Sequence, residues 1–218
     1  MSRAITIDVV SDVVCPWCFI GQKKLDRALA LVSDVDVEIN WRPYQLDPTI
    51  PKEGVDRQAY MIAKFGSSEK LDQIHARIEA IGQQLGIAFN FGGIKVAANT
   101  LDAHRVIRWA GATSAERQGT FTRNLFSAFF EQGRNIGDAD VLSDIAASSG
   151  MDAAIVAALL ASPSDVEAVQ QEIATAAQMG ITGVPCFLLD RRYALMGAQE
   201  PEALADAIRQ VVTAKHEA

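Results

Sequence analysis

Two short segments near the start of the chain alternate between apolar and polar residues, and a helical stripe separates them. Residues 5–10 follow a period of two except at the last step, and residues 35–41 follow it without a break. A period of two is typical of a strand. Between them, residues recur at steps of three and four, as on the buried face of a helix. These are Cys18, Gly21, Leu25, Ala28, Leu29 and Val32. The pattern predicts a β-α-β unit.

The end of the chain predicts a hairpin followed by a helix. Apolar runs at residues 186–189 and 193–196 flank Asp190-Arg191-Arg192, which is typical of two strands and a turn. Pro201 then opens a second stripe with helical spacing, so we expect the last helix to begin there. Strand-helix-strand followed by strand-strand-helix is the order of a minimal thioredoxin fold.

The long middle of the chain predicts helices that are inserted into this fold. Capping patterns pair Thr113 with Glu116 and Ser162 with Asp165, and five glycines mark expected helix ends. These are Gly86, Gly111, Gly133, Gly150 and Gly180. We expect five or six helices between about residues 55 and 179, with a long loop over residues 84–96.

The predicted fold class is therefore α/β, a thioredoxin-like fold with an inserted all-helical domain. The thioredoxin-like domain is discontinuous and takes residues 1–50 and 180–218. The helical insertion takes residues 51–179, and its last helix, at about 163–179, is expected to return to the sheet.

Composition and charge narrow the function classes. The chain has 218 residues, 49% of them hydrophobic, which suits a globular protein with a sizeable core. A formal net charge of −7 argues against a nucleic-acid or anionic-membrane partner. No apolar leader precedes the first strand, and no twenty-residue apolar stretch occurs. The expected location is cytoplasmic, a reducing compartment in which a C-x-x-C pair is more often catalytic than structural.

The candidate chemistry lies in Cys15-Pro16-Trp17-Cys18, at the junction of the first strand and helix. Pro16 suits the first helical position, and the helix N-terminus favours a thiolate at Cys15. Cys15 precedes the first turn and is expected to meet solvent, whereas Cys18 begins the buried stripe. This asymmetry suits an attacking thiol and a shielded resolving thiol, with Pro16 and Trp17 tuning the redox potential.

Two other interpretations of the pair fit the sequence less well. A zinc site normally needs four ligands, and the chain offers only Cys186 and three histidines besides the pair, so no metal is expected. A structural disulfide across three residues would close almost no loop and stabilise little.

The chain resembles the DsbA superfamily, and specifically its FrnE-like branch of cytoplasmic oxidoreductases. Six stretches carry the resemblance, and the first and fifth hold the chemistry. They are residues 11–21 (SDVVCPWCFIG), 41–48 (WRPYQLDP), 99–105 (NTLDAHR), 135–138 (NIGD), 180–185 (GITGVP) and 197–199 (GAQ).

The resemblance implies a thiol-disulfide oxidoreductase or isomerase acting on protein dithiols or disulfides, or on small thiols. Glutathione is a candidate redox partner, and no other cofactor is expected. A homodimer is also suggested, because acidic, helix-rich members of such families often dimerise. Pro185 is expected to be cis and to lie against the cysteine pair, with the backbone of Val184 docking the substrate. The plain alternative is an ordinary proline at the entry of a strand.

Several other residues each have a functional and a structural interpretation. Asp12 or Asp8 is a candidate for proton transfer at Cys18, or else a turn or surface residue. The resemblance places Asn99 and His104 near the substrate cleft, whereas they could instead be a helix cap and a buried, hydrogen-bonded histidine. Cys186 departs from the family pattern, in which an aromatic residue or threonine follows the proline. It is expected in the core, with a third reactive thiol as the alternative.

Two rival functions remain open. One is a glutathione-dependent isomerase or transferase resembling 2-hydroxychromene-2-carboxylate isomerase, a group that usually has serine at the first active-site position. The other is a client-binding, chaperone-like protein. Both Cys15 and Cys18 are present, which favours disulfide exchange over the first rival.

Overall fold

A four-stranded sheet forms the centre of the computed structural model, which describes residues 4–217, with side chains as far as residue 215. The strand order is β2-β1-β5-β6, in which β1 pairs parallel with β2 and antiparallel with β5, and β5 pairs antiparallel with β6. The strands are β1 (Ala4–Ser11), β2 (Asp36–Pro43), β5 (Cys186–Leu189) and β6 (Tyr193–Met196). Helix α1 (Pro16–Leu31) crosses from β1 to β2. The predicted thioredoxin-like order of elements is confirmed.

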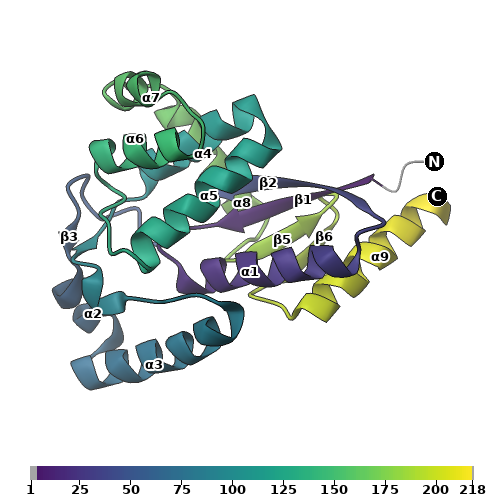
Figure 1. The fold of residues 1–218 in the computed structure, drawn as a ribbon, viewed down its shortest axis with the longest axis horizontal. Helices are drawn as coiled ribbons and strands as arrows, with labels where there is room; N and C mark the ends of the chain where they lie inside the picture. The colour runs from purple at the N-terminus through teal and green to yellow at the C-terminus, as the bar shows by residue number, and fades with distance from the viewer. Residues whose placement is uncertain (1–3, 218) are drawn as a thin grey trace.

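The two faces of the sheet pack against different helices. Ile7 and Val9 belong to the large core shared with α1 and α9 (Pro201–Glu217), which lie side by side in Figure 1. Val10 and Cys186 belong to a second apolar cluster with Ala176 of α8 (Val166–Gln178). Because neighbouring residues of a strand point to opposite faces, Val9 packs in the first core and Val10 in the second.

Seven α-helices lie between residues 55 and 179, a span that the structure describes in full, so the expectation of five or six was too low. They are α2 (Arg57–Phe65), α3 (Ser68–Leu85), α4 (Leu101–Thr113), α5 (Ala115–Phe130), α6 (Ala139–Ser148), α7 (Ala153–Leu160) and α8. The expected loop at 84–96 holds a 3-10 turn, Phe91–Gly93, and leads into β4 (Val96–Ala97), which pairs with β3 (Val55–Asp56). Figure 1 places α2 to the left of the start of α1, α3 below α1, and α4 to α7 above it.

Several predicted helix boundaries were displaced. Ser114 instead of Thr113 caps α5, and its hydroxyl accepts a hydrogen bond from the backbone N–H of Arg117. Gly111 lies inside α4 instead of at its end. A Cβ at this position would come within 2.6 Å of the Gln118 amide, so the close packing of Gln118 explains why the residue is a glycine. Helix α8 begins at Val166, three residues after the expected start.

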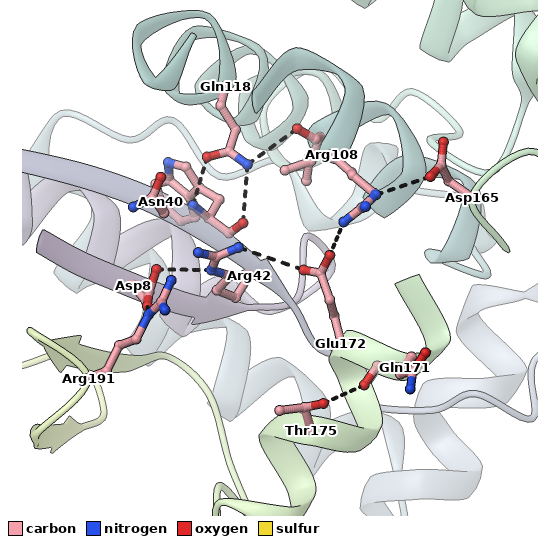
Figure 2. A network of polar contacts seen from close by, with 12 residues as sticks. Asp8, Asn40, Arg42, Arg108, Gln118, Asp165, Gln171, Glu172, Thr175 and Arg191 are labelled. Atoms are coloured by element: carbon pink, nitrogen blue, oxygen red, sulfur yellow. Dashed lines mark hydrogen bonds and ion pairs between the residues drawn. The ribbon is translucent and has the colours of Figure 1, made fainter. Parts of the chain in front are cut away.

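The outer edge of β2 is closed by a side chain of the helical part. The amide oxygen of Gln118 on α5 accepts a hydrogen bond from Trp41 N (2.9 Å), and its amide nitrogen donates to Trp41 O (3.2 Å). Figure 2 shows Gln118 reaching the strand in this way. A glutamine amide has the same donor and acceptor as a backbone peptide, so it satisfies the strand edge without adding a strand.

An ion-pair network joins the second face of the sheet to α8 and α4. Arg42 of β2 contacts Asp8 (2.9 Å) and Glu172 of α8 (3.9 Å), and Glu172 also pairs with Arg108 of α4 (Figure 2). Asp8 has a second partner in Arg191 of the β5–β6 turn, at 3.0 Å. Helix α8 therefore contacts the sheet through the charged side chain of Glu172 as well as through Ala176.

Candidate active site

Helix α1 begins directly at the cysteine pair. Cys15 is the N-cap residue with extended backbone angles (φ −93°, ψ 113°), and Pro16 takes the first helical position. The backbone N–H of Cys15 donates to Asp12 O (3.1 Å), which closes the turn after β1, and the N–H of Cys18 donates to Cys15 O (3.0 Å). The pair is thus held on one helical turn, as the sequence predicts, and both residues are free thiols in this structure.

The exposure of the pair differs from the prediction. Cys15 is only 4% exposed, close to the 1% of Cys18, so the expectation that Cys15 meets open solvent was wrong. Trp17 beside them is 39% exposed and borders the same cavity as Cys15. The two cysteines still differ in access. Cys15 lines a cavity of about 370 Å³, whereas Cys18 does not.

Burial controls the protonation of Cys18. Loss of hydration raises its pKa well above the ordinary value, and the neighbouring Cys15 thiol raises it further by hydrogen bonding and by charge. The Ser11 hydroxyl and the Asp12 backbone oppose this rise only in part. Cys18 is therefore a protonated thiol at neutral pH, as a resolving cysteine would be before its turn in an exchange reaction.

The Val184–Pro185 peptide bond is cis, as predicted, and it lies against the pair. The Cys15 thiol is 3.8 Å from Val184 O, within the range of a hydrogen bond from sulfur. Gly21 of α1 permits this approach, since a Cβ there would be 2.9 Å from Pro185 Cγ. Gly183 and Val184 line the same cavity as Cys15.

Asp12 and His104 form a buried pair behind the cysteines. One Asp12 carboxylate oxygen accepts from Leu46 N (2.8 Å), and the other lies 3.4 Å from His104 Nε2. The same His104 nitrogen lies 2.9 Å from Tyr44 O. Asp12 also lines the cavity, whereas His104 does not. The structure thus gives His104 contacts that hold the segment after β2, and its role toward a substrate stays a prediction.

Asn99 and Asp8 lie elsewhere. The Asn99 amide donates to Ile50 O (2.6 Å) and accepts from Leu101 N (2.9 Å), and the residue borders a different hollow, beside Arg105. Asp8 faces the second side of the sheet with its two arginines. Neither side chain lines the cavity beside Cys15, and the substrate role of Asn99 stays a prediction.

Cys186 lies in the core, as the sequence favoured. It is fully buried with Val10, Ala176 and Leu188 in the second apolar cluster, whereas Cys15 and Cys18 belong to the first. Burial raises the pKa of its thiol. Its environment is that of a small hydrophobic residue.

The cavity beside Cys15 contains several residues that sequence reasoning missed. Helices α2 and α3 and the Phe91 turn supply a large part of its wall. These residues are Arg57, Tyr60, Met61, Lys64, Phe65, Ile74, His75, Ile78 and Phe91. Phe129 and Phe130 of α5 also line it. The wall is mainly apolar, and within residues 4–215 no three His, Cys, Asp or Glu side chains cluster as a metal ion would need.

Comparisons with known proteins show the family of the chain. The DSBA-like thioredoxin domain matches residues 6–209, so the chain belongs to that family. A probable DsbA oxidoreductase from Streptomyces coelicolor has a similar structure, with a TM-score of 0.85 and 30% identity over 94% of this chain and 89% of that one.

Two further proteins are similar, one in sequence and one in fold. The Bacillus subtilis (strain 168) protein YwbO, described as uncharacterized, is 27% identical over 85% of this chain and 86% of its own length. The cytosolic disulfide reductase DsbM from Pseudomonas aeruginosa, solved with GSH, has a TM-score of 0.61 and 20% identity over 98% of this chain and 100% of that one. None of the helices in the described residues is long and apolar enough to cross a membrane.

Proposed function

We propose that the protein is a thiol-disulfide oxidoreductase or isomerase that exchanges disulfides with protein or small thiol substrates through Cys15 and Cys18. The observation that carries this proposal is the pairing of the two thiols on one turn at the start of α1, with the cis-Pro185 loop against them. The low exposure of Cys18 and its raised pKa support a resolving role.

The exchange takes place in two balanced steps. The Cys15 thiolate attacks one sulfur of a substrate disulfide, the substrate S–S bond breaks, and the released thiolate takes up a proton. Cys18 then gives up its proton and attacks Cys15 Sγ, so the mixed disulfide breaks and the second substrate thiol leaves. Two electrons and two protons pass to the substrate, and a Cys15–Cys18 disulfide remains. The reverse sequence oxidises a dithiol.

We extend the proposal to the subgroup, the redox partner and the cellular location of the enzyme. The residues quoted for the FrnE-like branch support membership of that subgroup, and the DsbM structure with GSH supports glutathione as a redox partner and a cytosolic location. Asp12 and the Pro16-Trp17 pair are proposed to tune the site. The homodimer stays a prediction.

A redox titration in glutathione buffers tests the proposal. Trp17 fluorescence reports the state of the pair, and mass spectrometry after alkylation identifies the bond. We expect a reversible two-electron transition with a Cys15–Cys18 disulfide. Cys18→Ala should accumulate a mixed disulfide at Cys15, whereas Cys186→Ala should titrate like the parent protein. Absence of an intramolecular bond in the parent protein would overturn the assignment.

The cavity favours one second candidate, a glutathione-dependent isomerase of small molecules. A mainly apolar pocket of about 370 Å³ that opens on Cys15 suits a small ligand better than a folded protein. The same titration separates the two functions, because the isomerase would retain glutathione at Cys15 or form no internal disulfide.

A further inference from the structure

The cavity wall contains a buried cation without an anion. Arg57 is only 8% exposed, and among the described residues no carboxylate forms an ion pair with it. Its guanidinium lies over the Phe91 ring, 5.7 Å from the centroid, and Nη1 makes one long contact with Phe91 O (3.4 Å). Burial lowers its pKa, and no nearby acid counters that effect. A buried charge is costly unless it is paired, so this arrangement indicates a missing anionic partner.

A second polar group beside Phe91 is also unsatisfied. The His75 ring stacks on Phe91 with centroids 4.1 Å apart, and its Nε2 atom is buried without a hydrogen-bond partner among the described residues. Burial, followed by the Arg57 charge, lowers the His75 pKa, so the ring is neutral near pH 7. Buried polar atoms in native proteins normally have partners, and an orphan in a cavity wall indicates a ligand.

The rest of the wall defines the other part of that ligand. Met61, Ile78 and Phe130 present apolar surface, and Cys15 lines the same space. Asp12 also borders it, but its carboxylate already accepts from Leu46 N. A negative group would therefore be repelled near Asp12 and Asp47 and attracted toward α2, which carries Arg57 and Lys64. This orients an apolar acid with its carboxylate at the buried Arg57, beside Phe91.

We propose that Arg57 and His75 bind the carboxylate of a small apolar acid that carries a thiol or disulfide, and that the cavity presents its sulfur to Cys15. The binding part stands on the cavity alone, whereas the sulfur chemistry rests on the proposed function. For a dithiol acid, one substrate thiolate attacks Cys15 of the Cys15–Cys18 disulfide and releases Cys18. The second substrate thiolate then closes its own disulfide and releases Cys15. Two electrons and two protons pass from the substrate to the cysteine pair.

The carboxylate site is tested first with probes that have no sulfur. Octanoate and octanamide have equal chain lengths and differ in charge. We expect calorimetry to show that octanoate binds the parent protein about 10- to 100-fold more tightly, the range for hydrogen bonds to a charged group. Arg57→Met should abolish this preference, and His75→Phe, which keeps the ring stack, should reduce it. Arg77→Met is the matched control, since it removes an exposed arginine of α3 outside the cavity.

Dihydrolipoate and dihydrolipoamide then test the sulfur chemistry against the oxidised enzyme, with Trp17 fluorescence as the readout. We expect the acid to react faster than the amide, and Arg57→Met to equalise the two rates. Equal binding of octanoate and octanamide by the parent protein would refute the carboxylate site, even if disulfide exchange is fast. Selective octanoate binding without reduction of Cys15–Cys18 by either dithiol would instead refute the proposed function and leave the anion site standing. Thermal unfolding of each variant checks that the fold is retained.

Discussion

Replacement of Gly21 by alanine should show how much stability depends on the close packing of α1 against the Pro185 loop. The new Cβ would lie 2.9 Å from Pro185 Cγ and 3.3 Å from Phe187 Cζ. The first contact is about 0.6 Å shorter than the optimal carbon–carbon separation of about 3.5 Å. Overpacking of this kind costs about 1–3 kcal/mol, whereas alanine gains about 1 kcal/mol over glycine inside a helix. The net loss of unfolding free energy should be about 0–2 kcal/mol.

Gly119→Ala is the matched control for this experiment. Gly119 also lies inside a helix, α5, and a Cβ there would meet nothing closer than the flexible end of Arg123, at 3.5 Å. This variant should gain up to about 1 kcal/mol. The difference between the two variants, about 1–3 kcal/mol, isolates the contact with Pro185 because helix propensity cancels.

Urea unfolding of both variants under reducing conditions measures the difference. Gly21→Ala should also change the rate at which Cys15 reacts with a small disulfide, since the displaced loop no longer holds Val184 O beside Cys15. Equal stability of the two alanine variants, with parental exchange rates, would refute the view that Gly21 is required for the close packing of Pro185.

Two further predictions concern buried groups. Arg105→Met should lower the free energy of unfolding, measured in urea, by about 3–5 kcal/mol. The reason is that the 1%-exposed guanidinium donates hydrogen bonds to Asp102 and to carbonyls at residues 159–164. A loss below about 1 kcal/mol would contradict this role. The reduced protein should lose stability as pH rises above about 8.5, since Cys18 has a higher pKa in the fold than in the unfolded chain. Unfolding curves from pH 7 to 10 should show a weaker decline for Cys18→Ala, and parallel declines would contradict the assigned shift.

The sheet and the cysteine pair were predictable because their signals are local. Strand β1 was expected at residues 5–10 and spans Ala4–Ser11, and both strands of the hairpin match the expected ranges. Each strand shows its own apolar pattern, and Pro16 marks the helix start by its missing N–H. The cis-Pro185 was identified through resemblance, since sequence alone also allowed an ordinary proline.

The helical part was harder to divide because packing between helices decides its boundaries. Gly111 has the chemistry of a helix end, yet it lies inside α4 to make room for Gln118. Asp165 was expected inside a capping box that starts at Ser162. It precedes α8 instead, with φ 59°, and its carboxylate accepts from Trp109 Nε1 (2.8 Å). Such long-range partners leave no periodic trace in the sequence.

The cavity could not be predicted from any single segment. Arg57 follows the capping residue Asp56 and has the sequence context of an exposed first turn, and Phe91 lies in a glycine-rich loop. A signal was available at His75, which adjoins the apolar stripe of α3 formed by Leu71, Ile74 and Ile78. Only the tertiary fold brings these groups to Cys15.

The contact between Cys15 and Val184 links the redox state of the site to substrate docking. In the dithiol form the Cys15 thiol is the group that points at Val184 O, at 3.8 Å. A thiolate or a disulfide sulfur has no proton to donate, so this carbonyl loses its partner when Cys15 ionises or is oxidised. An unpaired carbonyl beside the cysteine pair is then free to accept an N–H from an extended peptide. Under the proposed function, the states of the enzyme that react with substrate are therefore those in which the Val184 carbonyl is free.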